Sequence, residues 1–306
     1  MKIKTFLSIC LFSTFNLFGA IPDHFKKCPD KANNHNLKNI DFIYVINLDR
    51  RPERFEDFNK RINPYGIYPY RFSAVDGASM TIDTINDVGL KFQPWMKAGI
   101  MGTYYYQDEE GQVQHAHEII HDPNKTYFAH CVAKGPIAIM LSHLSVLQDA
   151  YDSGYETIWV MEDDMEIIRD PNVLPELIDK LDALVGKDGW DILFTDRDQK
   201  KQNGEYNSCY WHANRPNFTP WSAAVFANRQ IISDDFQKIG ARWGSHSMIL
   251  RRSGIEKLLD FVKVYRIFFP YDMDYILPSN IDEDIKLYTL LNDVVSNQPD
   301  SISDNK

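Results

Sequence analysis

The chain has 306 residues, a length that suits one large domain or two small ones. Its hydrophobic fraction of 44% and charged fraction of 25% are those of a soluble globular protein, so extended disorder is excluded. Asp and Glu outnumber Lys and Arg by 43 to 33, and the formal net charge is −10. This excess of acid argues against a protein that binds nucleic acid through general positive charge.

Residues 1–20 have the features of a secretory signal, with a basic start followed by an uncharged run. We therefore expect an exported protein, in the lumen of the secretory pathway, in a bacterial envelope or secreted. The run is short and contains polar residues, which favours cleavage near Ala20 over a short membrane anchor. An uncleaved segment would be the only part of the protein to contact a membrane. Residues 21–39 are polar and predict a linker.

Strands and helices are expected to alternate along the rest of the chain. Runs of β-branched and aromatic residues predict strands at residues 40–48, 68–75, 157–161, 191–195 and 247–251. Apolar residues at helical spacing predict helices at residues 53–62, 135–151, 173–185 and 253–264. This alternation predicts one α/β domain over residues 40–306, with a mainly parallel central sheet. Residues 81–134 have poor periodicity and predict an irregular insertion.

Ligands of such sheets bind beyond the carboxyl ends of the strands, so the residues that follow strands are the first candidates for a site. Glu162, Asp163 and Asp164 follow the strand at residues 157–161. If the alternation of the strand continues, Glu162 and Asp164 share one side and Asp163 faces away. Two carboxylates on one side suit Mg²⁺ or Mn²⁺, which would neutralise a leaving diphosphate. The alternative is a solvated acidic turn.

Three arginines follow the first strand in a chain that is acidic overall, namely Arg50, Arg51 and Arg54. Arginine forms bidentate hydrogen bonds to phosphate, so this turn is a candidate diphosphate site. The alternative is surface ion pairing with acidic residues of the next helix, such as Glu53. Asp196 also follows a predicted strand and belongs to the same edge of the sheet.

A rival interpretation rests on His117, Glu118 and His121, which match the H-E-x-x-H pattern of zinc peptidases. That pattern requires a helix, so that both histidines share one face. Here Pro123 would end a helix almost immediately. A polar segment of a lid is the simpler interpretation of these residues.

Several segments together resemble glycosyltransferase family 25, which includes bacterial lipopolysaccharide glycosyltransferases and procollagen galactosyltransferases. The segments are IYVINLDRRPERF at residues 43–55, FSAVDG at 72–77, GPIAIMLSHL at 135–144, IWVMEDDM at 158–165, a late block at 244–259, and PYDMDY at 270–275. Their order and spacing agree with the family over residues 40–304. The central helix departs from the family, because it begins Gly-Pro-Ile-Ala-Ile in place of Gly-Glu-Ile-Gly-Cys. This departure bears on the acceptor more than on the donor.

The resemblance implies a GT-A-like fold, typical of transferases that use nucleotide-diphospho-sugars. It also implies an inverting, metal-assisted transfer of a hexose, galactose or glucose, from a UDP-sugar to a glycan, glycoprotein or lipid-linked acceptor. Carried over by position, Glu162 and Asp164 would hold Mn²⁺ or Mg²⁺, and Asp163 would support the site. The residues that would border the nucleotide and its diphosphate or line the donor site are Asn47, Asp49, Arg50, Arg54, Asp76 and His143.

Inversion by a single displacement needs one general base near the acceptor hydroxyl. The match to the PYDMDY block implies Asp272, with Asp274 as an alternative and the acids at residues 282–284 as weaker ones. No nucleic-acid partner is expected. A different class of function also stays open, namely a glycan-binding or effector protein on a degenerate transferase scaffold, because the start of the central helix is altered and the chain carries an export signal.

Overall fold

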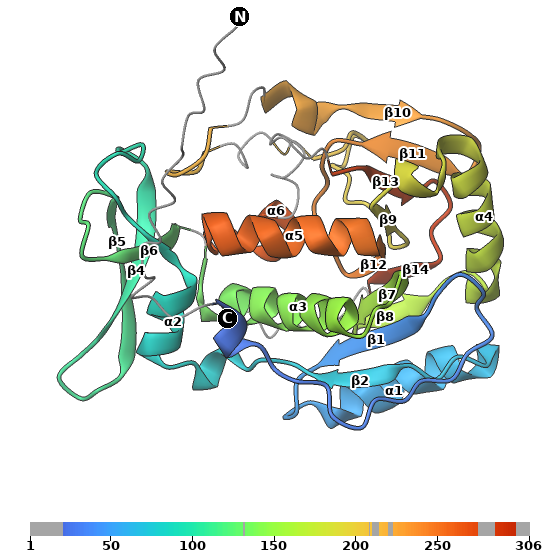
Figure 1. Cartoon of the computed structure of the whole chain (residues 1–306), viewed down its shortest axis with the longest axis horizontal. Helices are drawn as coiled ribbons and strands as arrows, with labels where there is room; N and C mark the ends of the chain where they lie inside the picture. Colours follow the sequence, from blue (N-terminus) through green and yellow to red (C-terminus); the bar gives the residue numbers. More distant parts are fainter. Residues whose placement is uncertain are drawn as a thin grey trace, which may run out of the picture.

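The computed structural model describes residues 21–130, 132–207, 209, 214–219, 223–274 and 285–297. All nine predicted strands and helices are confirmed, with boundaries shifted by a few residues (Figure 1). The described helices are α1 (Pro52–Ile62), α2 (Ile82–Val88), α3 (Lys134–Asp152), α4 (Leu174–Val185), α5 (Arg252–Tyr265) and α6 (Tyr271–Asp274). The described strands are β1 (Phe42–Asn47), β2 (Tyr70–Ser73), β3 (Leu90–Lys91), β4 (Met101–Gln107), β5 (Val113–Ile119), β6 (Thr126–Ala129), β7 (Thr157–Glu162), β8 (Met165–Ile167), β9 (Ile192–Phe194), β10 (Arg229–Ile231), β11 (Phe236–Ile239), β12 (Ser247–Arg251), β13 (Leu287–Leu290) and β14 (Val295–Asn297).

Eight of these strands form one sheet in the order β10-β11-β13-β9-β12-β7-β1-β2. β1 is parallel to β2 and β7, and β9 is parallel to β13. β12 is antiparallel to β7 and β9, and β11 is antiparallel to β10 and β13. The sheet is therefore mixed, and the predicted parallel arrangement holds only for β2-β1-β7 and β9-β13. A parallel neighbour needs a crossover, usually helical, and the described part of the segment between β9 and β12 contains no α-helix.

Helices cover both faces of this sheet. Alternate residues of each strand face opposite layers: Tyr44 and Val160 belong to the core beneath α3 and α5, whereas Val45 and Trp159 pack toward α1 and α4. α3 and α5 lie side by side in front of the sheet in Figure 1. β1 and β7 are buried on both faces, so each contains an unbroken run of apolar or aromatic residues that predicts a strand.

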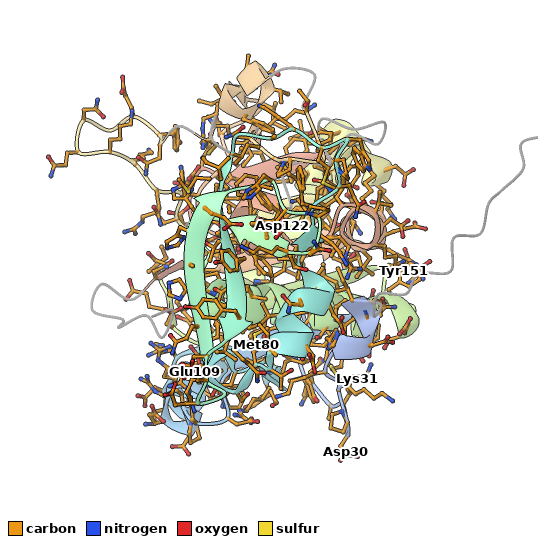
Figure 2. The ribbon with its side chains drawn as sticks, turned by 90° about the vertical axis from the view of Figure 1, so that its left-hand side faces the viewer. Asp30, Lys31, Met80, Glu109, Asp122 and Tyr151 are labelled. Carbon is orange, nitrogen blue, oxygen red and sulfur yellow. The ribbon has the colours of Figure 1, made fainter. Side chains whose placement is uncertain are left out.

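Residues 82–129 are not irregular, so this part of the prediction is wrong. They form α2 and a second, antiparallel sheet in the order β3-β6-β4-β5, seen at the left of Figure 1. Figure 2 faces this small sheet, with the β4–β5 turn at Glu109 and the turn before β6 at Asp122. Tyr105 is buried and meets Phe128 edge to face at 5.8 Å between ring centroids. β5 (VQHAHEI) is mostly exposed, so it lacks the apolar alternation that would reveal a strand.

The H-E-x-x-H sequence lies in this small sheet, which overturns the zinc-peptidase interpretation. His117 and Glu118 are neighbours in strand β5, so their side chains point to opposite faces. The His117 Nδ1 atom lies 2.9 Å from Thr103 Oγ1. The Glu118 carboxylate instead accepts hydrogen bonds from Lys125 and Tyr127. No helix brings the two histidines onto one face.

Residues 21–39 are part of the folded unit rather than a free linker. Ile21 is buried and belongs to the same apolar cluster as Leu144 of α3 and Val262 of α5. Lys31 Nζ lies 3.0 Å from the Asp149 carboxylate of α3. The predicted signal, residues 1–20, lies outside the described residues. Within the described part of the chain, no helix combines the length and apolar character needed to cross a membrane.

Candidate active site

A cavity of about 290 Å³ lies at the carboxyl ends of β1, β2 and β7, beside the first turns of α3. Its position agrees with the expectation that ligands bind at this edge of the sheet. It brings together seven of the residues predicted from the sequence, namely Arg50, Arg54, Asp76, His143, Glu162, Asp163 and Asp164. Asn47, Asp49, Asp272 and Asp274 do not line it.

A glycine closes one wall of the cavity. Gly77 follows β2, and a Cβ atom at this position would lie 2.9 Å from the Lys134 carbonyl oxygen in the first turn of α3. Only glycine permits this close approach of two backbones. The turn after β2 and the start of α3 therefore form one continuous surface of the cavity, which Gly77 and Lys134 both line.

Glu162 and Asp164 converge as the strand pattern predicted, and a third residue joins them. One potential ligand atom from each of Glu162, Asp164 and His246 lies within 4.8 Å of the others, among the described residues. His246 immediately precedes β12, and its carbonyl oxygen accepts a 2.9 Å hydrogen bond from Glu162 N. Because β12 is antiparallel to β7, the residue before β12 reaches the same edge as the residue that ends β7. His246 was not among the predicted site residues, because a parallel sheet was expected. Its signals in the sequence are its place directly before a predicted strand and within the late block at residues 244–259.

Two imidazoles flank the Glu162 carboxylate. His246 Nδ1 lies 3.3 Å from Oε2, and His143 Nε2 lies 3.5 Å from Oε1. Burial alone would raise the pKa of Glu162, but the two histidines hold it well below the ordinary value. Burial lowers the pKa of His246 and the Glu162 carboxylate raises it, with a net result of about 9. His143 is itself fixed by stacking on Tyr271, with 4.1 Å between the ring centroids.

Asp163 points away from this cluster, toward β1. Its carboxylate accepts a 2.6 Å hydrogen bond from Asn47 Nδ2 and lies 3.4 Å from Arg54 NH1. Burial raises the pKa of Asp163 to about 6 against the opposing effect of these two partners. Asn47 Oδ1 in turn accepts a 2.6 Å hydrogen bond from Arg71. Asn47 therefore holds the acidic turn in place from below the cavity and does not line it.

The arginine turn is divided between the cavity and its surroundings. Arg50 lines the cavity and donates a 3.0 Å hydrogen bond to Asp76, which also lines it. Arg51 instead pairs with Glu53, as the surface interpretation expected. Asp49 faces an adjoining hollow of about 460 Å³, which shares Arg50 and Asp76 with the cavity. Of the three arginines, Arg50 and Arg54 thus line the cavity.

The two candidate bases of α6 have different surroundings. Asp272 accepts a 3.1 Å hydrogen bond from Gly244 N, and burial raises its pKa. Asp274 is fully buried; it pairs with Arg215 and accepts hydrogen bonds from the backbone N–H groups of Phe268 and Phe269.

These contacts occupy both oxygens of Asp274 and stabilise the loop before α6. Asp274 does not line the cavity, and its catalytic role stays a prediction. The acids at residues 282–284 lie outside the described residues.

The protein thus has an α/β fold, with a polar cavity lined by carboxylates at the carboxyl ends of strands of its main sheet. The profile of a family described as "Glycosyltransferase family 25 (LPS biosynthesis protein)" matches residues 40–276, which include every described wall of this cavity. The chain belongs to glycosyltransferase family 25.

Individual relatives match parts of the chain at lower identity. A "Glycosyltransferase 25 family member" of Aedes aegypti is 26% identical over 166 residues, 54% of this chain and 23% of the relative. One of Drosophila melanogaster is 24% identical over 193 residues, 62% of this chain and 27% of the relative. The "Inactive glycosyltransferase 25 family member 3" of Mus musculus is 25% identical over 162 residues, 52% of this chain and 22% of the relative. The chain thus spans about a quarter of the length of these relatives.

Proposed function

We propose that this protein is a GT-A-like, metal-assisted glycosyltransferase. It transfers a hexose, galactose or glucose, from a UDP-sugar to a glycan, glycoprotein or lipid-linked acceptor with inversion. Family membership supports the class of reaction. The observation that carries the metal assistance is the cluster of Glu162, Asp164 and His246, which adjoins the cavity that holds Arg50 and Arg54.

The residues of the cluster fit a divalent cation. Two carboxylates and one imidazole are a donor set for Mn²⁺ or Mg²⁺, which commonly complete their coordination with water and substrate phosphates. A bound ion would stabilise the negative charge that develops on the departing diphosphate. Arg54 and Arg50 lie on the β1 side of the same cavity, where their guanidinium groups would bind phosphate oxygens.

Asp272 is the residue that we assign as general base. In a single displacement the acceptor oxygen forms the new bond to the anomeric carbon as the bond to UDP breaks, and the hydroxyl proton must leave. Asp272 sits beside the loop that carries His246, held by Gly244 N–H. Because its pKa is raised, the Asp272 carboxylate takes up a proton more readily than an exposed carboxylate does.

We also propose that the protein is exported. An export signal in residues 1–20 would place the enzyme in a compartment that receives nucleotide sugars, such as a lumen that imports them. In a bacterium the donor would have to be supplied outside the cytoplasm. Truncation of residues 1–20 in a reporter fusion tests whether this segment directs export.

The direct test is a panel of UDP-sugars incubated with purified protein, because many transferases slowly hydrolyse their donor and the acceptor then need not be known. We expect one UDP-hexose to be hydrolysed in the presence of Mn²⁺, with activity lost in EDTA and restored by added metal. Hydrolysis that is equally fast in EDTA would contradict the metal assistance. The absence of both turnover and UDP binding would contradict the transferase itself.

A second candidate function is non-catalytic glycan binding on a transferase scaffold. The inactive designation of the mouse relative supports it, together with the altered start of α3. The same panel separates the two functions, because glycan affinity without hydrolysis of any donor would favour the second.

A further inference from the structure

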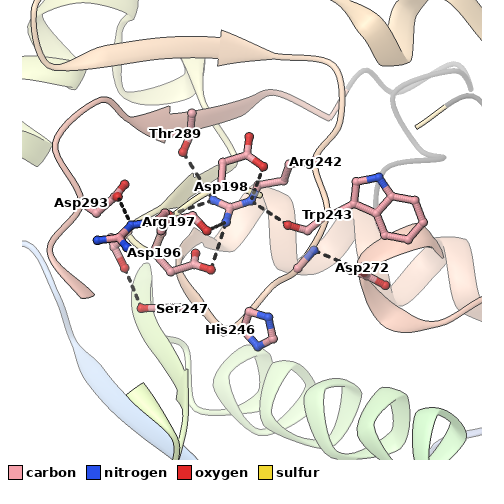
Figure 3. Close-up of polar contacts among 12 residues, drawn as sticks. Asp196, Arg197, Asp198, Arg242, Trp243, His246, Ser247, Asp272, Thr289 and Asp293 are labelled. Atoms are coloured by element: carbon pink, nitrogen blue, oxygen red, sulfur yellow. Dashed lines mark hydrogen bonds and ion pairs between the residues drawn. The ribbon is translucent and has the colours of Figure 1, made fainter. Parts of the chain in front are cut away.

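Arg242 is fully buried, although arginine is almost never buried unless it is paired. Its guanidinium donates to the Asp196 carboxylate at 3.0 Å and to the carbonyl oxygens of Asp196 and Arg197 at 3.2 and 3.0 Å (Figure 3). Weaker contacts of 3.4 Å reach Thr289 Oγ1 and the Trp243 carbonyl. Together these contacts use every nitrogen of the guanidinium group.

The partners of Arg242 lie on two neighbouring strands of the main sheet. Asp196 and Arg197 follow the end of β9, and Thr289 belongs to β13. Asp196 is one of the residues that sequence analysis placed at the ligand edge, but it is fully buried and does not line the cavity. Arg242 lies in the connection between β11 and β12. Its hydrogen bonds therefore fasten this connection to β13 and to the residues that follow β9.

The same connection carries two groups of the candidate site. Gly244, two residues after Arg242, has a φ of +82° and donates its N–H to the Asp272 carboxylate. His246, four residues after Arg242, approaches the Glu162 carboxylate. In Figure 3 Arg242 lies among Asp196, Arg197 and Thr289, with His246 below it and Asp272 to its right.

We propose that Arg242 is a positioning residue, which acts through Asp196 to fix His246 and the Gly244 N–H, and so the candidate cation ligand and the candidate base together. This inference rests on the proposed function. Groups that orient metal ligands from behind typically change metal affinity or activity by about 10–100-fold when they are mutated. A lysine at position 242 would keep the charge and lose the fork that reaches β9 and β13 at once.

Arg251 provides a matched control, because it ends β12, whereas Arg242 lies in the connection before this strand. Arg251 ends β12, is largely buried, and donates to both oxygens of Asp182 at 2.8 and 2.7 Å. It also stacks over Trp190, as Arg242 does over Phe194. Arg251 touches no residue of the cavity among the contacts described. Arg251→Lys therefore removes a comparable, largely buried guanidinium fork without touching the site.

The experiment compares wild type, Arg242→Lys, Asp196→Asn and Arg251→Lys. Mn²⁺ binding to each protein is measured by electron paramagnetic resonance, and folding by circular dichroism and thermal melting. Hydrogen exchange of peptides that cover residues 240–247 is followed by mass spectrometry. We expect Arg242→Lys and Asp196→Asn to weaken Mn²⁺ binding about 10-fold or more and to speed exchange in residues 240–247. Arg251→Lys should lower the melting temperature by a similar amount while leaving both readouts within about 2-fold of wild type.

Three results would overturn the positioning role: wild-type Mn²⁺ affinity in a folded Arg242→Lys protein, unchanged exchange of residues 240–247 in that variant, or equal losses in Arg251→Lys. If Arg242→Lys does not fold, Asp196→Asn, which keeps the size of the side chain, decides the question. A wild-type protein that binds no Mn²⁺ would contradict the proposed metal assistance, and the exchange data would then still test the positioning role.

Discussion

His246 Nδ1 lies 3.3 Å from Glu162 Oε2, although 84 positions separate the two residues in the chain. One ends a strand and the other precedes its antiparallel neighbour. The contact makes the acidic turn and the late segment of the chain parts of a single site. Four predictions test this site and the packing around it.

Asp164→Ala should sharply lower the rate of metal-dependent donor hydrolysis while the fold survives. Loss of one carboxylate from a cation that stabilises the leaving diphosphate should cost about 3 kcal/mol or more in the transition state, which corresponds to about 100-fold in rate. Donor hydrolysis at saturating Mn²⁺ measures the loss. Glu166→Gln, two residues further on and outside the cavity, is the control and should hydrolyse donor as wild type does. Wild-type turnover in Asp164→Ala would remove this residue from the cation site.

Asp272→Asn should separate donor binding from chemistry. The amide keeps the size of the side chain but cannot take up a proton, and loss of a general base typically lowers the rate by about 100-fold or more. Calorimetric titration with UDP and Mn²⁺ should give an affinity within about 2-fold of wild type. A parallel loss of UDP affinity would indicate that Asp272 shapes the donor site, and an unchanged rate would exclude it as the base.

Arg215→Met should destabilise the protein without altering the chemistry of the protein that remains folded. The change leaves the fully buried Asp274 carboxylate without its cation, and breaking a buried pair in this way typically costs about 3–5 kcal/mol. Urea denaturation followed by fluorescence gives the free energy of unfolding. The double variant Arg215→Met/Asp274→Leu should recover much of the loss, because it removes both charges. A loss below about 1 kcal/mol would show that the pair is not buried as described.

Cys28 should react slowly with alkylating reagents at pH 8. Burial and the Asp149 carboxylate raise the pKa of its thiol from the ordinary 9.0 to about 12. The thiolate fraction at pH 8 then falls about 1,000-fold, and the greater nucleophilicity of a more basic thiolate recovers about 20-fold, which leaves a reaction about 50-fold slower. Because deprotonation is required, the rate should still rise with pH above 10.

Peptide mapping after iodoacetamide treatment follows Cys28 separately from the other cysteines. Asp149→Asn should speed the reaction by removing the negative charge next to the thiol. Reaction of wild-type Cys28 at the rate of a free cysteine would mean that residues 21–39 detach from α3 and behave as the linker that their composition suggested.

The sequence was sufficient for the elements whose burial leaves a local pattern. β1 and β7 each contain an unbroken apolar run, and the carboxylates at and after the end of β7 reach the cavity as predicted. His246 could not be found in this way, because its position depends on the direction of β12, and pairing direction is not encoded within one strand. The ion pair of Asp274 could not be foreseen, because residue type and position do not distinguish a carboxylate that faces a substrate from one that pairs with a buried arginine.

The small sheet and residues 21–39 were missed for a related reason. β5 is largely exposed, so its strand character comes from hydrogen bonding to β4 and leaves no hydrophobic alternation. In residues 21–39, isolated apolar residues such as Ile21 and Leu37 are buried by other segments of the chain. Neither β5 nor residues 21–39 have the regular spacing of apolar residues by which a strand or helix is predicted.

The side-chain amide of Asn47 restricts which substitutions position 47 can accept. Its nitrogen serves the Asp163 carboxylate and its oxygen serves the Arg71 guanidinium, so both ends are engaged by partners of opposite charge. An aspartate here would place a second carboxylate against that of Asp163, and a leucine of similar shape would remove one hydrogen bond from each partner. Neither of these substitutions of similar shape keeps both hydrogen bonds of Asn47. Sequence changes below the cavity are therefore expected first at other positions.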